Sequence, residues 1–520
     1  MISLLPVSGT LRTQQRRSLL AILLLAFLPA VALGHAKLVR SEPKPKETLA
    51  AVPKLVELWF SEELESGLNT IEVKDQTGKR MDRGEVALSE GNKKAQVELG
   101  ELTPGLYTVT WKALSADQHA MRGSFVFTVS ALSPTPPPVS ASSDQSPNFS
   151  PTPTPHNQDQ MSSMSDAEDS GNQIFWGQTL VRWVSYISMM LLFGGFAFRS
   201  FVLIPALRRA TDGAERMEAG RAGERRLLRL LWLGVIVSAV TSVVALVLQA
   251  SDVFDKSFVG TISPSVLAQV LETGYGPSWI LQVGSLIAIG IILMLLTTGL
   301  KRHPDGEQTV LWWAGLVAGV ALLVAPSWTG HAMVSVNHFR LAVLSDWLHL
   351  LAGGVWVGGL FHLALAWPAS FSKVSDRNRP SALHHLIRSF TRTAMPSVAL
   401  LVLAGLYNTW AHVPGLKALW LTPYGQALLV KLSLVLLMLV LGAINNYHFG
   451  KRVGRLARNQ KGSEINRAAP IERGLYRSVA FEASLGLVVL LVTAVLVFLT
   501  PARNHPAMDN VGPGETETQR

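Results

Sequence analysis

The sequence predicts an all-β sandwich on the N-terminal side, followed by an all-α membrane bundle of eight transmembrane helices. Three observations predict this architecture. Short segments of alternating apolar and polar residues recur before residue 130. Eight long apolar segments follow residue 172, most of them long enough to cross ~30 Å of hydrocarbon as a helix. Charged residues make up 16% of the chain, against roughly 25% in soluble proteins, so an ordinary soluble enzyme is not expected.

Composition limits the chemistry that this chain can carry. Its 520 residues are too many for one compact core, and its net charge is +10. Such an excess fits either nucleic-acid binding or the cytoplasmic loops of a membrane protein. The chain has 13 His and 13 Met but no Cys. Disulfides, thiolate metal sites and thiol nucleophiles are therefore excluded, and a transition metal would have to be bound by His, Met, carboxylates or a backbone amine.

Residues 1–34 have the pattern of a secretory signal peptide, with a basic flank and an apolar run of the usual length. Two cleavage points compete. Cleavage after Ala32 would leave Leu33 as the first residue, whereas cleavage after Gly34 would leave His35. The small-residue pattern by itself favours the former.

Residues 35–130 are expected to form an exported β domain, an immunoglobulin-like or cupredoxin-like sandwich. Two of its segments alternate clearly, and their apolar residues are expected to share one face: Tyr107, Val109, Trp111 and Ala113 in one strand, and Phe125, Phe127 and Val129 in the next. Residues 131–172 are rich in Pro, Ser and Thr, which predicts an extended linker. At the other end, residues 504–520 are expected to be a disordered outer tail.

Residues 173–503 are expected to form the membrane bundle. The apolar segments are centred on 178–204, 228–250, 278–300, 309–327, 343–367, 394–412, 425–446 and 478–500. Alternate loops carry 22 Lys and Arg in total, and the loops between them carry 3. Since basic loops stay in the cytoplasm, this asymmetry orients the bundle, and the even number of crossings puts both chain ends outside. The positive excess is therefore mainly a topology signal, and no nucleic-acid partner is expected.

Asp117 and His119 stand just before the last predicted strand, and at this spacing both side chains point to one face of an extended segment. Two ligands are too few for a metal site, and a surface turn is the commoner meaning of such a pair. If cleavage exposes His35, its α-amine and imidazole can chelate one ion together with His119. That nitrogen-rich set suits Cu(II). Binding should weaken as the pH falls, because the amine and imidazoles must be deprotonated.

Two segments of the exported half look like the periplasmic copper-binding protein CopC. They are His35-Ala-Lys-Leu-Val-Arg-Ser-Glu-Pro43 and Ser115-Ala-Asp-Gln-His-Ala-Met-Arg-Gly-Ser-Phe125. The resemblance implies a Cu(II) site made by His35, Asp117 and His119, in which His35 binds through its amine and its ring. It also favours cleavage between Gly34 and His35.

The membrane half resembles CopD. The resemblance is carried by Gly330-His-Ala332, Asp346-Trp-Leu-His349, Trp356-Val-Gly-Gly-Leu360 and Tyr424-Gly-Gln-Ala-Leu-Leu-Val-Lys431. The order of the two halves is similar to that of CopC–CopD fusions, which are linked to copper uptake and copper resistance. This implies copper as the bound metal, the lipid bilayer as a partner, and a location in the cytoplasmic (inner) membrane of a bacterium. A periplasmic copper chaperone or a reductase would be further partners.

The fifth apolar segment contains a second candidate site. Asp346 and His349 are spaced i, i+3 and share one helical face. Burying such a pair in a membrane is costly unless it is paired or lines a pathway, which favours function over a structural Asp–His hydrogen bond. His331, Met333 and His338 lie in the adjoining outer region and could receive a copper ion from the exported domain.

Other residues are ambiguous. Lys431 either snorkels outward or neutralises Asp346. In the linker, His156, Met161 and Met164 could hold Cu(I) transiently, although an ordinary polar linker containing Met accounts for them equally well. The pattern Gly354-Val-Trp-Val-Gly358 predicts close helix packing. Glu482 lies inside the eighth segment, near its cytoplasmic end.

The sequence favours a metal-binding transporter over an enzyme. In this hypothesis the sandwich captures Cu(II), and the bundle passes copper across the membrane, as Cu(I) after reduction by an unidentified reductant. Cupric reductase activity is left open, and no ATP-binding motif is visible. The main alternative is a haem-bearing redox protein with axial ligands among His331, His349, His362 and His412, although these form no clean four-His pattern. A histidine-brace oxidase and a copper-storage module are further alternatives.

Overall fold

The structure is a computed structural model that describes residues 38–61, 63–115, 120–130, 159–254, 256–302, 308–328, 339–458 and 468–499. The chain divides into two compact units. We call them the sandwich unit, which contains Ala36–Val181 and Ser242–Trp279, and the bundle unit, which contains Arg182–Thr241 and Ile280–Arg520.

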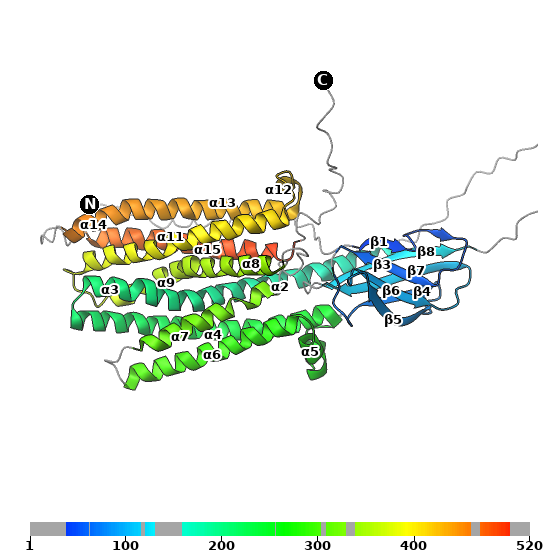
Figure 1. Cartoon of the computed structure of the whole chain (residues 1–520), viewed down its shortest axis with the longest axis horizontal. Helices are drawn as coiled ribbons and strands as arrows, with labels where there is room; N and C mark the ends of the chain where they lie inside the picture. The colour runs from blue at the N-terminus through cyan, green and yellow to red at the C-terminus, as the bar shows by residue number, and fades with distance from the viewer. Residues whose placement is uncertain are drawn as a thin grey trace, which may run out of the picture. The chain divides into compact units, whose positions relative to one another are not determined.

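Two four-stranded sheets form the sandwich (Figure 1). One has the order β1-β3-β6-β5 and the other the order β2-β8-β7-β4. All pairs are antiparallel except β2 with β8, which is parallel. The strands are β1 (Leu38–Glu42), β2 (Thr48–Leu49), β3 (Leu55–Phe60), β4 (Thr70–Asp75), β5 (Asp82–Ser89), β6 (Lys94–Leu99), β7 (Gly105–Leu114) and β8 (Ala120–Val129).

The core lies between the sheets and follows the alternation of the sequence. The residues expected to share a face in β7 and β8 are buried, which confirms that prediction: Tyr107, Val109, Trp111, Ala113, Phe125, Phe127 and Val129. They pack with alternate residues of β3, namely Val56, Leu58 and Phe60. Over most of their length β3, β7 and β8 thus bury every second side chain, as half-buried strands with period two must. The ring centroids of Phe60 and Trp111 are 5.2 Å apart in an edge-to-face pair.

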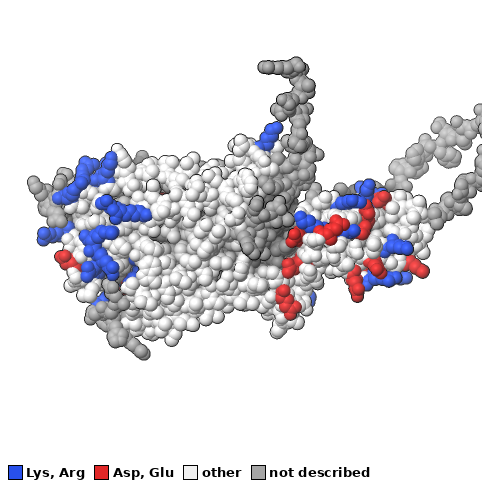
Figure 2. Space-filling view, in the orientation of Figure 1, with Lys and Arg blue, Asp and Glu red and all other residues white. Residues whose placement is uncertain are grey.

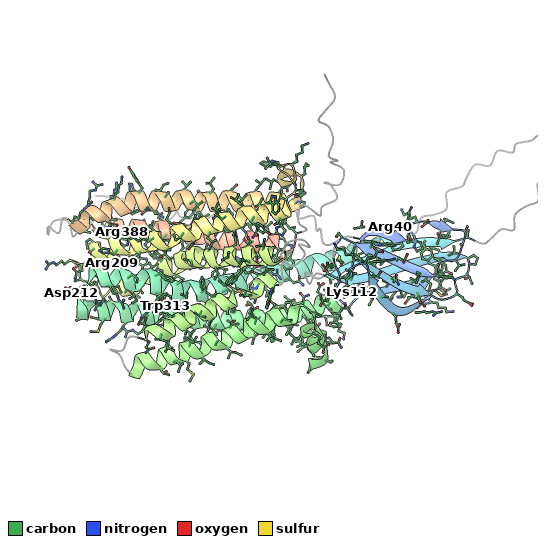
Figure 3. All side chains as sticks on the ribbon, viewed as in Figure 1. Arg40, Lys112, Arg209, Asp212, Trp313 and Arg388 are labelled. Atoms are coloured by element: carbon green, nitrogen blue, oxygen red, sulfur yellow. The ribbon has the colours of Figure 1, made fainter. Side chains whose placement is uncertain are left out.

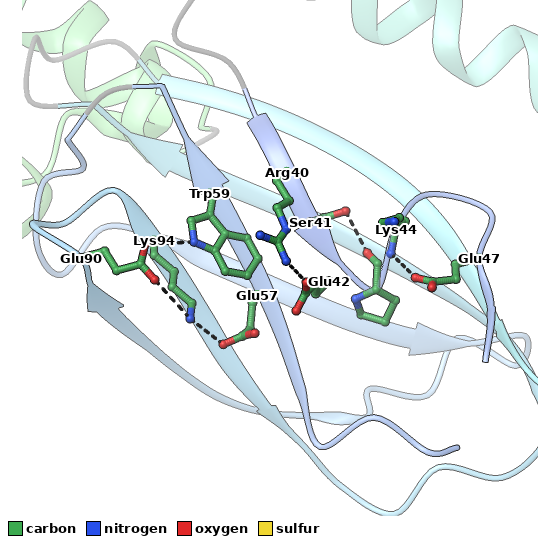
Figure 4. A network of polar contacts seen from close by, with 10 residues as sticks. Arg40, Ser41, Glu42, Lys44, Glu47, Glu57, Trp59, Glu90 and Lys94 are labelled. Atoms are coloured by element: carbon green, nitrogen blue, oxygen red, sulfur yellow. Dashed lines mark hydrogen bonds and ion pairs between the residues drawn. The ribbon is translucent and has the colours of Figure 1, made fainter. Parts of the chain in front are cut away.

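The outer face of the β1–β3–β6 sheet is polar, and its centre is Trp59 (Figure 4). Arg40 of β1 and Lys94 of β6 each place a cation 4.7 Å from the centroid of this ring. The ammonium of Lys94 also pairs with Glu57 at 2.8 Å, and this contact raises the pKa of Lys94. These contacts join the short edge strand β1 to its neighbours through side chains as well as through the backbone.

The helical part consists of long helices, some of them interrupted by π-helical turns. In chain order the elements are α2 (Asp159–Ala197), η1 (Phe198–Leu203), α3 (Ile204–Ala210), α4 (Gly213–Phe254), η2 (Val259–Thr261), α5 (Pro264–Leu271), α6 (Tyr275–Arg302), α7 (Thr309–Leu322), η3 (Ala325–Trp328), α8 (Phe339–Gly353), η5 (Gly354–Gly358), α9 (Gly359–Leu365), α10 (Trp367–Phe371), α11 (Arg379–His412), α12 (Ala418–Leu421), α13 (Pro423–Ile444), η6 (Asn445–Phe449), α14 (Gly450–Arg458) and α15 (Ala468–Leu496).

Among the described residues, eight helical stretches are long and apolar enough to cross a membrane. The expected fold class, a β-sandwich followed by an eight-helix membrane bundle, is confirmed. The first helix begins earlier than the expected bundle, because α2 starts at Asp159, inside the segment 131–172 assigned to the linker. The last proline before α2 is Pro155, and no proline interrupts the chain again until Pro205. A helix can therefore form as soon as the Pro-rich segment ends.

The helix α8–η5–α9 is packed closely against α2 in the bundle unit. A Cβ atom on Gly358 would lie 2.3 Å from the backbone oxygen of Met190, and one on Gly194 would lie 2.6 Å from the backbone of Gly358. A Cβ on Gly354 would meet the ring of Phe193 at 2.6 Å. The small-xxx-small pattern is therefore a close-packing face, as predicted.

Basic side chains gather at one end of the bundle unit (Figure 2). Figure 3 labels two of them, Arg209 near the end of α3 and Arg388 in α11, together with Asp212 at the α3–α4 turn. We call this the basic end. The carboxylate of Glu215 joins two segments there, because it accepts hydrogen bonds from the Ser375 backbone and the Asn378 side chain, both at 2.5 Å.

Candidate functional site

The predicted ligands of the exported domain, His35, Asp117 and His119, lie outside the described residues, but the chain on either side of them is described. Leu38, three residues after His35, is paired with Phe60 at the end of β3. Four residues beyond Phe60, Leu64 forms a bridge with Ser115. The described chain therefore begins at Leu38 beside Phe60, and it is interrupted after Ser115 beside Leu64. Both points adjoin one short stretch of the sandwich, between Phe60 and Leu64.

The segment 115–119 is anchored on both sides. Leu114 and Ala120 form the last pair of the β7–β8 ladder, and Ser115 is fully buried. Within the same unit, Leu114 and Ala120 pack against Val253 at the end of α4. Arg122 donates to the backbone oxygen of Asp252 at 2.6 Å and to its carboxylate at 3.2 Å. The base of this segment is therefore fixed by apolar packing and by an ion pair to one end of α4.

In the bundle unit, Asp346 and His349 lie on α8, in the half of the α8–α9 helix farther from the basic end. The Nδ1 atom of His349 is buried and has no hydrogen-bond partner among the described residues. The ring contacts the backbone of Leu401 on α11 and faces Gly405 one turn further along, where a Cβ would stand 3.5 Å from Cε1. Glycine leaves room for the imidazole between the two helices.

Side chains from two further helices surround Asp346. Lys431 and Tyr424 of α13, and Tyr186 of α2, all lie within electrostatic range of its carboxylate. Lys431 also acts on the ring of His349. We call Asp346, His349, Tyr186, Tyr424 and Lys431 the polar cluster.

The structure thus brings Lys431 to the Asp346–His349 pair, one of the two arrangements left open by the sequence. Sequence reasoning missed both tyrosines. Tyr424 opens the motif that ends in Lys431, and Tyr186 follows Arg182, a charged residue four positions earlier in the first apolar segment. An arginine inside an apolar membrane segment indicates that a polar side chain lies next to it. In the structure Arg182 contacts Tyr186.

The remaining predicted residues are not placed at either site. His156, His331, Met333 and His338 lie outside the described residues, and Met161 and Met164 fall on the first turns of α2. No group of three or more His, Asp or Glu side chains within the described residues is arranged to hold a metal ion.

The other two histidines considered as haem ligands bind backbone carbonyls of their own helices. Nδ1 of His362 lies 2.8 Å from the oxygen of Gly358, and Nδ1 of His412 lies 2.7 Å from that of Asn408. The haem alternative gains no support.

Known protein families match the chain along most of its length. Residues 38–130 match the CopC domain, residues 164–338 the copper resistance protein D-like N-terminal domain, and residues 384–496 copper resistance protein D. The copper transport protein CutJ of Bacillus subtilis is 27% identical over 492 residues, which cover 94% of this chain and 78% of that protein.

Similar proteins also exist for the single halves. Copper resistance protein C of Pseudomonas syringae pv. tomato is 33% identical over 107 residues, which cover 19% of this chain and 84% of that protein. The crystal structure of CopC from Methylosinus trichosporium OB3b matches with 33% identity and a TM-score of 0.18, and covers 18% of this chain and 94% of that chain. The order of the matched domains, together with the similarity to copper resistance protein C and CutJ, identifies the chain as a member of the CopC–CopD fusion family, a multi-pass membrane protein with an N-terminal CopC domain.

Proposed function

We propose that this protein captures Cu(II) outside the bacterial cytoplasmic membrane and transfers copper across it. The relatives named for copper transport and copper resistance support copper as the cargo. In this proposal the sandwich holds Cu(II) through His35, Asp117 and His119, and the polar cluster of the bundle takes copper up from the outer side.

The observation that carries the transport proposal is the unpartnered Nδ1 of His349, buried one turn from Asp346 in a membrane-spanning helix. A buried nitrogen without a partner costs about 1–3 kcal/mol, so such a group is retained at a cost in stability. An imidazole nitrogen and a carboxylate are both suitable copper ligands. Ionisable groups inside a membrane bundle commonly mark an ion pathway.

Lys431 has a defined place in this proposal. A lone carboxylate at Asp346 would be costly to bury, and the ammonium of Lys431 lies close enough to offset its charge when no metal is present. An arriving copper cation supplies the same positive charge. We propose that copper and Lys431 compete for Asp346, so that the carboxylate of Asp346 has a positively charged partner both with and without copper.

The charge distribution supports the orientation. Basic loops remain in the cytoplasm, so the basic end is proposed to face inward. Asp346 and His349 then lie in the outer half of the bundle. This is the side to which the sandwich would be exported behind its signal peptide.

The transport proposal is tested by Asp346→Asn and His349→Gln, two substitutions that keep size but remove charge or ligand nitrogen. Copper accumulation should fall by about tenfold or more in both variants, since even indirect support of a metal ligand is worth 10–100-fold. Cu(II) binding by the purified full chain should keep its outer-domain component. His448→Gln, an exposed histidine of η6, is the matched control and should accumulate copper normally.

Normal accumulation in Asp346→Asn and His349→Gln would contradict the pathway and leave the pair a structural contact. If the wild-type protein binds copper without moving it across sealed vesicles, the storage alternative is correct. A purified protein with a Soret absorption band would instead support the haem alternative.

A further inference from the structure

Glu482 is a buried carboxyl group for which the proposed copper pathway has no use. The residue is 3% exposed and lies on α15, about 7.5 Å deeper than Arg477, the last basic residue of that helix, at 1.5 Å per residue. Its neighbours Val479 and Ala483 are buried and apolar. Placing a carboxylate in such surroundings without a cation costs several kcal/mol.

One short chain of hydrogen bonds reaches this carboxyl. Its Oε2 accepts from the amide of Asn445 at 3.1 Å, and the amide oxygen of Asn445 accepts from Ser478 at 2.6 Å. Oε1 lies beside Gly442, where a Cβ would be only 3.3 Å away. Ser478 is half-buried and one turn nearer the basic end. The polar groups therefore lead from the buried Glu482 toward the basic end.

In the part of the bundle that the structure describes, no charged group faces Glu482. The described elements that contact α15 include α2, η5, α9, α11, α13, η6 and α14. Among their titratable groups, His362 stacks on Phe198, Lys431 faces Asp346, and Lys451 lies over Tyr447. On α2, Arg182 lies over the ring of Phe498 and Tyr186 interacts with Asp346. The histidines of α11, His384 and His385, interact with each other and with Arg388, and His448 is exposed. Only Asn445 acts on the carboxyl of Glu482, besides its burial.

We propose that Glu482 is the proton-binding site of the transport cycle, a role that rests on the proposed transport function. Asn445 donates to Oε2, so Oε1 is the oxygen that carries the proton. When a copper cation moves into the bundle, the O–H bond at Oε1 breaks, its electron pair stays on Oε1 and H⁺ passes to water at the basic end, while Asn445 and Ser478 keep their hydrogen bonds and hold Oε2. The carboxylate that remains balances one positive charge of the cargo, and once the cargo has left, a proton taken up from the opposite, outer side restores the neutral carboxyl, so that one proton crosses per turnover.

Local backbone structure fits a group that changes its occupancy. Asn445 is the first residue of η6, a π-helical turn, and such turns often occur at functional sites in helices. Ser478 fixes the orientation of the Asn445 amide, so its NH₂ group points to the carboxyl. An amide can donate to the carboxyl whether or not Oε1 is protonated, which lets both states persist in the same packing.

The proton on Glu482 is measured by infrared spectroscopy of the full chain in lipid vesicles at neutral pH, with no copper needed. The wild-type protein should show a C=O band of a protonated carboxylic acid that is lost in Glu482→Gln. The substitution is nearly isosteric, and its amide oxygen can still accept from Asn445. Glu472→Gln, the same change on the same helix beside Arg379, is the control and should keep the band. A band equally strong in wild type and Glu482→Gln would overturn the proposal.

The coupling is measured as copper uptake into vesicles with and without an imposed pH gradient. In the wild type, one pH unit should change the uptake rate by up to about tenfold if one proton moves per turnover. Glu482→Gln should lose this response, whereas Glu482→Asp, which keeps a titratable carboxyl, and Glu472→Gln should retain it.

The infrared and uptake measurements together distinguish the coupling role of Glu482 from the proposed copper transport. A wild-type response that persists in Glu482→Gln overturns the coupling role while leaving copper transport intact. If the wild-type protein moves no copper in either condition, transport itself is wrong, and with it the coupling; the infrared band then still decides whether Glu482 binds a proton.

Discussion

Single polar side chains define the chemistry of this protein at the scale of the residue. His349 and Glu482 both have buried polar atoms in the bundle: among the described residues, Nδ1 of His349 has no hydrogen-bond partner, and no cation acts on the carboxyl of Glu482. Asp346 is accompanied by Lys431, but Glu482 has only the amide of Asn445. The first arrangement suits a cation that replaces an ammonium, and the second suits a proton.

His35 carries the prediction for the outer site. If its free α-amine and ring together bind Cu(II), an alanine inserted between Gly34 and His35 should weaken binding by at least about tenfold, or 1.4 kcal/mol, because the amine becomes an amide. Binding by the natural protein should also weaken as the pH falls, since protons compete for the same nitrogens. Isothermal titration of the full chain with Cu(II) measures both effects.

An alanine inserted after Ser140, in the predicted linker, is the control for chain length. Unchanged affinity in the His35 variant would remove the chelate from the model of the site. A mature protein that begins at Leu33, established by its intact mass, would do the same.

At the scale of the element, the contact between α2 and the α8–η5–α9 helix depends on glycine. Gly194 and Gly358 allow the two backbones to touch, and the neighbouring Met190 supplies a carbonyl oxygen where a side chain would otherwise stand. Without water to drive helices together, such packing is a main source of association in a membrane. The same helix carries Asp346 and His349, so its position against α2 sets where these groups lie.

Gly358→Ala is therefore expected to destabilise the bundle by about 1–3 kcal/mol, because the new Cβ would lie 2.3 Å from a backbone oxygen that cannot rotate away. Gly353→Ala is the matched control: it lies on the same helix and its Cβ would meet no atom within 4 Å. Thermal unfolding of the purified variants in detergent measures the difference. Equal melting temperatures would show that the two helices can separate at little cost.

At the scale of the whole molecule, the segregation of charge predicts the topology. The basic loops hold 22 Lys and Arg against 3 in the others, and those with described side chains gather at one end of the bundle unit. The excess of Lys and Arg in alternate loops follows the rule that basic loops of a membrane protein remain in the cytoplasm.

The absence of cysteine from the chain makes the orientation directly testable. A single cysteine at Asp212, at the basic end, should react with a membrane-impermeant thiol reagent only after the membrane is opened. A cysteine at Gly415, in the exposed segment between α11 and α12, should react in intact spheroplasts. The reverse pattern would invert the proposed orientation and place the polar cluster on the cytoplasmic side.

The sequence by itself determined the strands and the spans, and it predicts the side to which the basic loops belong. Alternation in β7 and β8 was sufficient to predict that Tyr107 and Phe127 are buried, because period two is a local property of the chain. The start of α2 at Asp159 differed from expectation, since a Ser-rich composition obscured a helix that begins after the last proline.

Only the tertiary structure decided which helices face one another. It brought Tyr186 of α2 and Lys431 of α13 to Asp346, and it joined Glu482 to Asn445 across two helices. In a water-soluble bundle, an apolar stripe identifies the face toward the core. In a membrane the lipid-facing side is equally apolar, so the periodicity of a spanning helix does not reveal its neighbours, and packing among small and polar residues makes that choice.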